Sequence, residues 1–209
     1  MKITVIGAAS GIGLALTQQA LERGHEVTAL IRNPAKLTLS HPKLRVTKGD
    51  VRDQASIEAA LIGQDAVCVS IGVSPSRKPI DTFSQGSRSV LAALQKMPNV
   101  KFVSVTGIGA GDSRGHGGFF YDKLLQPLLL KTIYEDKDRE EVNIKASTAD
   151  WMIVRPGMLT NGARTGSYRV LTDMNGVTAG KISRADVADF VLNQLEQPTH
   201  FKQTPLLTY

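Results

Sequence analysis

The chain has 209 residues, and its 25 Lys and Arg exceed its 19 Asp and Glu, for a formal net charge of +6 at pH 7. Hydrophobic residues make up 42% of the chain and charged residues 21%, which excludes a globally disordered protein. The single cysteine excludes a disulfide framework and a cysteine-rich zinc site, and it fits a reducing compartment. We expect one domain over residues 1–209.

Nothing in the sequence suggests a membrane or a nucleic acid as partner. No apolar run reaches the roughly 18 residues that a membrane span needs, and the amino-terminal residues lack the pattern of a signal peptide. The basic residues are scattered rather than clustered, which favours a phosphorylated small molecule over a nucleic acid. We therefore expect a cytoplasmic protein that binds a small molecule.

The predicted elements alternate between strands and helices. In chain order they are a strand at 2–6, a helix at 14–23, strands at 26–32 and 44–49, a helix at 56–62, a strand at 66–71, a helix at 82–96, a strand at 101–105, a mostly helical stretch at 123–146, a strand at 151–154, an extra strand at 168–171 and a helix at 185–196. Near-continuous apolar strands separated by helices predict an α/β protein, with a doubly wound parallel sheet of the Rossmann type. The stretch after Pro156 is richer in Gly, Thr and Arg, and we expect it to form a small substrate-side region of the same domain.

A glycine-rich turn lies between the first predicted strand and the first helix. Gly7 permits the tight turn, Gly11 lets the backbone approach a pyrophosphate, and Gly13 lets the helix pack closely on the sheet. The helix start offers unpaired N–H groups to phosphates. Because no Lys-Ser or Lys-Thr follows, this is not a nucleotide-triphosphate loop. The turn predicts a dinucleotide site that includes Gly7, Ala9, Ser10, Gly11, Ile12 and Gly13.

The end of the second strand indicates which dinucleotide binds. An acidic residue there would bind a ribose 2′-hydroxyl group, but the sequence has Arg32, with Lys36 close by. A guanidinium can pair with a 2′-phosphate and stack on adenine, so NADP(H) is preferred to NAD(H). The alternative is that Arg32 is an ordinary exposed arginine.

Two further strand ends are predicted to line the dinucleotide. After the third strand, Asp50 can accept a hydrogen bond from the adenine amino group while Val51 packs on the ring; Asp50 can also cap the following helix. Ser70, Ile71 and Gly72 end the fourth strand, where Gly72 would permit close approach to the ribose next to the nicotinamide.

A loop at 107–118 is half glycine and follows the carboxyl end of the fifth strand, where ligands of such sheets bind. Phe119, Phe120 and Tyr121 come next and can stack on a planar substrate. We expect either a mobile lid over the nicotinamide or a solvent loop capped by aromatic residues. His116 is a proton-donor candidate, although a lone loop histidine is more often simply exposed.

Taken together, these features resemble the atypical short-chain dehydrogenases/reductases, in particular the biliverdin-IXβ reductase/flavin reductase and NmrA-like NAD(P)-binding families. The resemblance covers nearly the whole chain. Its markers are the turn 7–13, then 31–33, 49–51, 63–67, 155–156, 165–168 and 182–188. It is specific for fold and cofactor class and less so for substrate, and it implies a monomer.

The resemblance also implies residues at the nicotinamide. Thr106 and Gly107 end the fifth strand, and where relatives have a serine near the hydride-transfer site this chain has Gly107. Lys137 matches a position that contacts the nicotinamide ribose. Pro156, Gly157 and Met158 match the loop behind the nicotinamide ring.

The usual proton donor of short-chain dehydrogenases is not present in its usual spacing. Those enzymes carry Tyr-x3-Lys, whereas Tyr134 lies three residues before Lys137. The catalytic residue is therefore unassigned, with Tyr121, Tyr134 and Lys137 as candidates. Without a donor, the substrate must suit bare hydride transfer, as flavins, linear tetrapyrroles and quinones do.

We therefore interpret the sequence as an NADPH-dependent oxidoreductase acting on a planar conjugated acceptor. One alternative is a non-catalytic NADP(H)-binding redox sensor, and another is an epimerase-like sugar-nucleotide enzyme, which the missing Tyr-x3-Lys disfavours. The histidines show no metal spacing, so we predict no metal. Cys68 and Trp151 are expected in the core.

Overall fold

The computed structural model describes residues 1–209, and its centre is one mostly parallel sheet. The strands of this sheet are β1 (Lys2–Ile6), β2 (Glu26–Ile31), β3 (Leu44–Lys48), β4 (Ala66–Val69), β5 (Lys101–Val105), β6 (Trp151–Pro156), β8 (Arg169–Leu171) and β10 (Leu206–Thr208). Their order is β3-β2-β1-β4-β5-β6-β10-β8, and only β8 runs antiparallel to its neighbour. The predicted Rossmann-like doubly wound sheet is confirmed.

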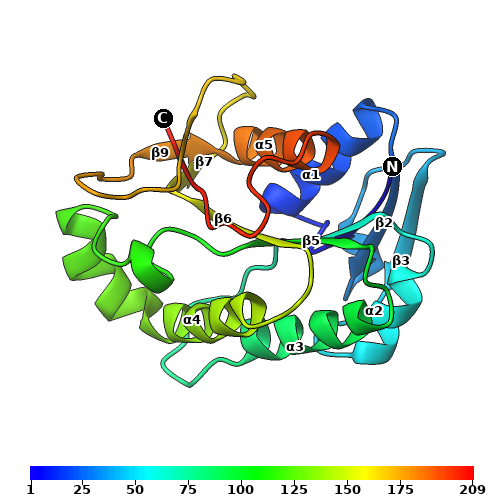
Figure 1. The fold of residues 1–209 in the computed structure, drawn as a ribbon, viewed down its shortest axis with the longest axis horizontal. Coiled ribbons are helices and arrows are strands. Elements are labelled where there is room, and N and C mark those ends of the chain that lie inside the picture. The colour runs from blue at the N-terminus through cyan, green and yellow to red at the C-terminus, as the bar shows by residue number, and fades with distance from the viewer.

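Helices cover both faces of the sheet (Figure 1). One layer holds α1 (Gly11–Glu22) and α5 (Arg184–Glu196), and the other holds α2 (Gln54–Leu61), α3 (Thr82–Gln95) and α4 (Lys131–Lys145). None of these helices is long and apolar enough to cross a membrane.

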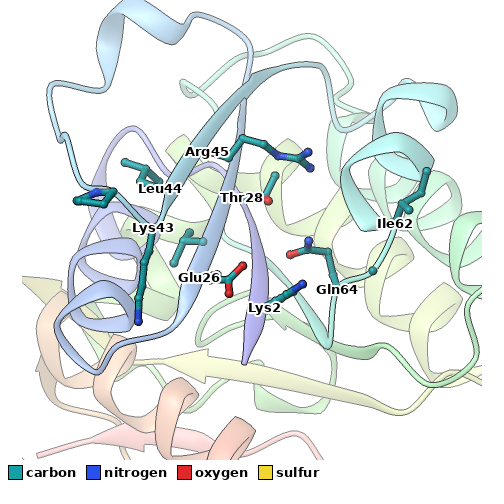
Figure 2. A pocket seen from close by; sticks show the side chains of 11 residues that line it. Lys2, Glu26, Thr28, Lys43, Leu44, Arg45, Ile62 and Gln64 are labelled. Carbon is teal, nitrogen blue, oxygen red and sulfur yellow. The ribbon is translucent and has the colours of Figure 1, made fainter.

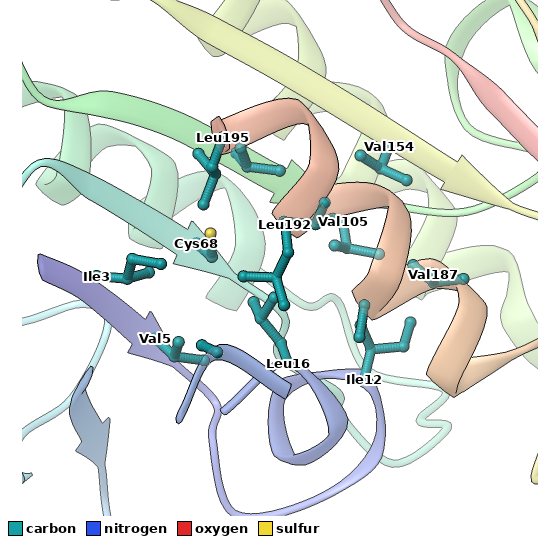
Figure 3. Packing of buried hydrophobic residues seen from close by; sticks show 14 of the residues in the cluster. Ile3, Val5, Ile12, Leu16, Cys68, Val105, Val154, Val187, Leu192 and Leu195 are labelled. Atoms are coloured by element: carbon teal, nitrogen blue, oxygen red, sulfur yellow. The ribbon is translucent and has the colours of Figure 1, made fainter. Parts of the chain in front are cut away.

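Each layer has its own apolar core. Under α1 and α5 a cluster of 24 buried residues includes Leu16, Leu192 and Cys68, which meet between the helices and the strands in Figure 3. A second cluster of 16 residues, with Phe102 and Trp151, lies under the opposite layer. Cys68 and Trp151 are therefore core residues, as predicted. Burial also raises the pKa of the Cys68 thiol to about 12, so the group is an unreactive neutral thiol at neutral pH.

The observed elements differ from the predicted ones mainly in the second half of the chain. The short strands β7 (Met158–Thr160), β9 (Lys181–Ser183) and β10 were not predicted, because three residues are too few to show a strand period. The predicted strand at 168–171 is β8. The predicted helical stretch at 123–146 is two elements, a π-helical segment η3 (Tyr121–Leu130) that contains Pro127, followed by α4. Proline lacks the N–H that a regular α-helical turn uses, which fits the change of geometry at this point.

Polar contacts fix how α5 lies on α1. The Gln19 amide donates to the Ala185 carbonyl at 2.9 Å, near the start of α5. Farther along, the Arg23 guanidinium pairs with Asp189 at 2.7 Å and with Glu196 at 3.0 Å. These contacts join the carboxyl-terminal end of α1 to both the start and the end of α5.

The Asp186 carboxylate ties the last quarter of the chain together. It is fully buried, and its two oxygens accept hydrogen bonds from Thr165, Gly166, Ser183 and Tyr209. Burial alone would raise the pKa of Asp186, but these hydrogen bonds, led by that from Tyr209, hold it below its ordinary value. One ionised carboxylate thus joins the 160s loop, the start of α5 and the carboxyl terminus.

Replacing this carboxylate should destabilise the fold. Asp186→Ala leaves several buried donors without an acceptor, and we expect it to lower the free energy of unfolding by about 2–4 kcal/mol. Tyr209→Phe removes one of the donors and should lower it by about 1 kcal/mol. Urea denaturation of both variants measures the difference, and equal losses would contradict a network centred on Asp186.

Candidate functional site

A cleft of about 390 Å³ opens at the carboxyl ends of β1, β2 and β4. Ten of the residues predicted to bind a dinucleotide line it: Gly7, Ala9, Ser10, Arg32, Lys36, Asp50, Val51, Ser70, Ile71 and Gly72. The sequence analysis missed other lining residues, among them Asn33, Val73 and Thr82. Asn33 directly follows Arg32 and Val73 directly follows Gly72. Both could have been predicted by extending each strand end by one residue.

The glycine turn leaves no room for side chains at two of its three glycines. A Cβ on Gly7, whose φ is +92°, would lie 2.2 Å from the Ser70 carbonyl oxygen. A Cβ on Gly13 would lie 2.3 Å from the Gly7 carbonyl oxygen. Helix α1 therefore starts in direct contact with the strand ends, as the roles assigned to these glycines require.

The start of α1 fits a phosphate group. Ser10 precedes the helix but its side chain makes no capping hydrogen bond, so the first N–H groups of α1 have no side-chain cap. Gly11 has a φ of +60°, and the atom nearest to where its Cβ would be is Nε of Arg184, at 3.9 Å. The Arg184 guanidinium is held by the Asn161 side chain at 2.7 Å. No local pattern in the sequence indicates that this arginine lies at the glycine turn.

Two cations without an ion pair lie at the end of the cleft where the adenosine is predicted to bind. Arg32 follows β2, and Lys36 ends the short helix η1 (Pro34–Lys36), which the Asn33 side chain caps through the Ala35 N–H. Both basic side chains are exposed and neither forms an ion pair. A phosphate on the ribose would meet two cations that have no competing partner.

The structure corrects the capping role predicted for Asp50. The cap of α2 is Asp53, whose side chain accepts from the Ala55 N–H. The Asp50 carboxylate accepts hydrogen bonds from the Arg52 backbone at 2.9 Å and from the Arg52 guanidinium at 3.2 Å, and this hydrogen bonding holds the pKa of Asp50 below its ordinary value. Asp50 lines the cleft as an ionised carboxylate with further acceptor sites, and its hydrogen bond to the adenine amino group stays a prediction.

Of the other predicted residues, all those described next except Met158 have no exposed side chain to offer a ligand. The Ile12 side chain is 5% exposed and lies in the core (Figure 3). The Thr106 hydroxyl is buried and donates to Glu141 at 2.9 Å. Gly157 packs on the backbone, since a Cβ there would lie 2.5 Å from the Gly180 carbonyl oxygen. Pro156 is buried, and Met158 is exposed.

Two tyrosines meet beside Gly107, where the resemblance places the nicotinamide. The Tyr121 hydroxyl lies 2.5 Å from the Tyr134 hydroxyl and 3.0 Å from the Ile108 carbonyl oxygen. A Cβ on Gly107 would lie 3.0 Å from the Tyr134 hydroxyl, and the φ of +141° favours glycine there. The Tyr134 phenol therefore lies next to the position where relatives carry a serine side chain.

Burial keeps both phenols neutral. It raises the pKa of Tyr121, helped by the neighbouring phenol, and it raises the pKa of Tyr134 against the opposing hydrogen bond from Tyr121. Each neutral hydroxyl carries one proton. The Tyr121 proton can go either to the Ile108 carbonyl, in which case Tyr134 donates to Tyr121, or to Tyr134, in which case the Tyr134 proton is available to another acceptor.

Lys137 lies beneath the same strand end in a cluster of buried charges. Its ammonium donates to the Thr106 carbonyl and lies 4.6 Å from the centre of the Phe83 ring. Burial lowers the pKa of Lys137, and Glu140, Glu141 and Asp136 oppose that shift. Tyr134 lies three residues before Lys137. The position four residues before Lys137, where the Tyr-x3-Lys pattern has its tyrosine, is the buried Ile133.

The first part of the glycine loop is anchored. Ile108, Ala110 and Ser113 are buried. The fully buried Arg155 guanidinium holds Asp112 of the loop at 2.5 Å and Glu141 of α4 at 2.5 Å. The loop thus contacts α4 through a charged network, while Gly111, Asp112, Arg114 and Gly115 are exposed, and its role as a lid stays a prediction.

The side chains of His116 and the neighbouring aromatic residues differ in their contacts and exposure. His116 hydrogen-bonds the Val177 carbonyl at 2.8 Å. Tyr121 turns inward, but Phe119 is 80% and Phe120 60% exposed, so these two do not line the cleft. No group of three or more His, Cys, Asp or Glu side chains has a metal-binding arrangement.

A second cavity, of about 400 Å³, lies at the opposite end of the sheet (Figure 2). It is lined by polar side chains from the first residues of the strands and their preceding loops, including Lys2, Glu26, Lys43, Arg45 and Gln64. No predicted site residue reaches it. Ligands of parallel sheets bind at the carboxyl ends of the strands, so we assign the site to the first cleft.

Comparison with known proteins agrees with the glycine turn and the cleft. A family model described as NAD(P)H-binding matches residues 7–198. The chain belongs to this NAD(P)H-binding family. The resemblance inferred from the sequence is thereby confirmed.

Similar proteins include reductases. The uncharacterized protein YwnB of Bacillus subtilis is 27% identical, over 96% of this chain and 94% of that protein. The anaerobillin reductase ChuY of Escherichia coli O157:H7 superposes with a TM-score of 0.84 at 23% identity, over 100% of this chain and 97% of the other. A putative NADH-flavin reductase from Streptococcus pneumoniae TIGR4 gives 0.75 at 25% identity, over 100% and 99%.

An epimerase is also among the relatives. The N-acetyl-alpha-D-glucosaminyl-diphospho-ditrans,octacis-undecaprenol 4-epimerase of Escherichia coli O157:H7 is 28% identical over 83% of this chain, but over only 54% of its own length. Family membership therefore supports a nicotinamide cofactor and an oxidoreductase-like fold, and leaves the reaction to be argued from the residues.

The buried charges predict a specific pH dependence of stability. Burial raises the pKa of Glu140 from 4.5 to about 7, against the opposing effects of Lys137 and the Ser104 hydroxyl. The unfolded chain thus loses the Glu140 proton at lower pH than the folded chain does. The contribution of Glu140 to the free energy of unfolding therefore falls as the pH rises from 4.5 to 7. Glu140→Gln has no proton to lose, so its stability relative to the unsubstituted protein should increase across this window by up to about 3 kcal/mol.

Urea denaturation at several pH values measures this difference. Glu135→Gln is the control, since it removes the same charge from an exposed position on the same helix. A Glu140→Gln difference that stays flat between pH 4.5 and 7 would contradict the raised pKa.

Proposed function

We propose that the protein is an NADPH-dependent reductase that transfers a hydride to a planar conjugated acceptor such as a flavin, a biliverdin-like tetrapyrrole or a quinone. The observation that carries this proposal is the Tyr134 hydroxyl 3.0 Å from the Cβ position of Gly107. It supplies a neutral proton donor at the strand end where the resemblance puts the nicotinamide, although the usual Tyr-x3-Lys is absent.

The proposed dinucleotide site begins in the cleft, which Arg32 lines, and continues beyond it to Gly107 after β5, the strand next to β4. The N–H groups at the start of α1 and the Arg184 guanidinium bind the diphosphate, and Arg32 with Lys36 binds the 2′-phosphate. Besides the ten cleft residues already named, we propose backbone contacts from Gly11, Ile12, Gly13, Thr106, Pro156 and Gly157, and contacts from the Met158 and Lys137 side chains. The close backbone packing at Gly7 and Gly13, where no side chain fits, supports this assignment.

When bound, NADPH would supply a hydride, and the reduced acceptor also needs a proton. The Tyr134 phenol is neutral at pH 7, and burial raises its pKa further, so we propose that it acts as a donor and not as a base. Tyr121 orients it through the 2.5 Å hydrogen bond. Lys137 positions the end of β5 through the Thr106 carbonyl. The resemblance implies that it also contacts the nicotinamide ribose.

The residues favour reduction over epimerisation. An epimerase of this fold would need a phenolate-forming tyrosine paired with the lysine four residues on, and Ile133 occupies that position. A non-catalytic sensor remains the second candidate, because a site for the 2′-phosphate accounts for dinucleotide binding and does not by itself imply turnover.

Arginine substitutions test the cofactor site. Arg32→Ala removes a guanidinium from the 2′-phosphate, so the Kd for NADPH should rise about 10–100-fold while the Kd for NADH changes little. Arg184→Gln should raise both dissociation constants by a similar factor, since both dinucleotides carry the diphosphate. Arg45→Ala, an exposed arginine outside the cleft, is the control in calorimetric titrations. Equal effects of Arg32→Ala on both nucleotides would refute the NADP assignment.

Turnover with planar acceptors tests the reaction. NADPH oxidation, followed by absorbance with FMN or a quinone, should be catalysed, and Tyr134→Phe should lower kcat about 100-fold with an unchanged Kd for NADPH. Tyr168→Phe, a tyrosine paired with Asp189 on α5, is the control. Tight NADPH binding without turnover of any such acceptor would favour the sensor, and an unchanged kcat for Tyr134→Phe would remove this phenol from the reaction.

A further inference from the structure

The second cavity, at the amino-terminal ends of the strands, has polar walls (Figure 2). Its volume of about 400 Å³ is within the range of small-molecule sites. Cross-strand neighbours supply one wall, since Lys2 of β1 pairs with Glu26 of β2, and Thr28 of β2 pairs with Arg45 of β3. Side chains alternate between the faces of a strand, so these four point to the same face of the sheet and reach the cavity together.

The turn after α2 supplies the opposite wall. Helix α2 ends at Leu61, and Gly63, with a φ of +70°, turns the chain back toward the sheet. The Gln64 N–H donates to the Leu61 carbonyl at 3.1 Å, and the next N–H, that of Asp65, donates to the Lys2 carbonyl at 2.8 Å. The Gln64 side chain therefore extends from a fixed turn toward the strands, as Figure 2 shows.

Two buried polar groups in these walls have no hydrogen-bond partner in the protein. Thr28 is 5% exposed and its hydroxyl makes no hydrogen bond, whereas the Thr4 hydroxyl on the same face of the sheet donates to the Ala60 carbonyl at 2.8 Å. The Gln64 Oε1 atom is also buried without a partner. Buried polar groups in folded proteins nearly always have partners, so two such groups at one cavity indicate a partner from outside the chain.

The cations in the lining indicate that this partner is an anion. The Arg45 guanidinium and the Lys2 ammonium form neither an ion pair nor a hydrogen bond within the protein. Lys43 also lines the cavity, but its ammonium donates to the Gly24 carbonyl at 2.8 Å. Arg45 and Lys2 are thus the two cations that remain for a ligand.

The acceptors in the lining indicate the rest of the ligand. Glu26 is the one carboxylate that lines the cavity, and the nearby Asp65 is occupied by the Lys2 backbone N–H, which donates to it at 2.7 Å. Glu26 and the Gln64 oxygen can accept hydrogen bonds from hydroxyl groups, while Glu26 would repel a second anionic group. The ligand that fits therefore has one anionic group and several hydroxyl groups.

We propose that this cavity is a second binding site, which takes a small hydroxylated anion. Its phosphate or carboxylate group binds Arg45 and Lys2, and its hydroxyl groups bind Glu26, Thr28 and Gln64. The site is separate from the dinucleotide cleft, which lies at the carboxyl ends of the same strands.

Calorimetric titration with three-carbon probes tests the ligand chemistry. The full chain is saturated with NADPH, which keeps the dinucleotide cleft filled. Glycerol 3-phosphate or glycerate should bind with a Kd of about 1 mM or lower, and glycerol, which lacks the anionic group, should not bind. The tighter of the two anions identifies the charged group. Its counterpart without hydroxyl groups, inorganic phosphate or acetate, should bind about 5-fold more weakly.

Amide chemical shifts locate the bound probe whether or not the proposed function holds. They should change at residues 26–28, 43–45 and 62–64 and not at 7–13. Arg45→Gln with Lys2→Gln should raise the Kd of the probe about 10-fold or more. The matched control, Arg88→Gln with Lys181→Gln, removes the same charges from exposed positions outside the cavity and should leave this Kd unchanged. Thr28→Val, which removes only the hydroxyl group, should raise it about 3-fold or more.

Four results would overturn the proposal. These are no binding of either anion, glycerol binding as tightly as the anions, shift changes confined to residues 7–13, and an equal loss of affinity in the control variant.

Discussion

The contact between the Gly7 turn and the start of α1 is the constraint on which the rest of the site depends. Gly13 lies so close to the Gly7 backbone that a Cβ would come within 2.3 Å of a carbonyl oxygen, and Gly7 is equally close to Ser70 at the end of β4. The helix therefore begins at the strand ends, where its uncapped N–H groups face the cleft. Helix α5 follows α1 through the Gln19 and Arg23 contacts, which brings Arg184 beside Gly11.

A second group of interactions, the buried charges on α4, organises the loop that follows β5. Arg155 is fully buried in β6 and holds both Glu141 and the loop residue Asp112. Removing two charges from water is costly, and such a pair persists where its geometry and hydrogen bonds compensate. Here the pair fixes the glycine loop against α4. Tyr134 belongs to the same helix α4, and Tyr121 contacts the loop at the Ile108 carbonyl, so the loop and α4 together hold the two phenols next to Gly107.

The tyrosine pair and the absent serine are complementary features. Gly107 has a φ of +141°, and the space that a side chain would need is adjacent to the Tyr134 hydroxyl. A Cβ at this position would lie 3.0 Å from the phenol oxygen, so a side chain there would require the Tyr134 ring to shift slightly. The proposed donor is thus a phenol at the strand end where the resemblance expects a serine hydroxyl.

Local patterns in the sequence determined the sheet, the order of most helices, the glycine turn and the cations Arg32 and Lys36, because each follows from residues adjacent in the chain. The short strands β7, β9 and β10 were missed, since their pairing depends on partners far along the chain and not on a period of their own. Only the tertiary structure decided that Arg184 lies beside Gly11 and that the Tyr134 hydroxyl lies next to Gly107. It also decided that Arg52 hydrogen-bonds Asp50 and that Arg155 holds the glycine loop through Asp112. These depend on side-chain directions and on contacts between separate elements, which the packing of the whole chain sets and a local pattern does not encode.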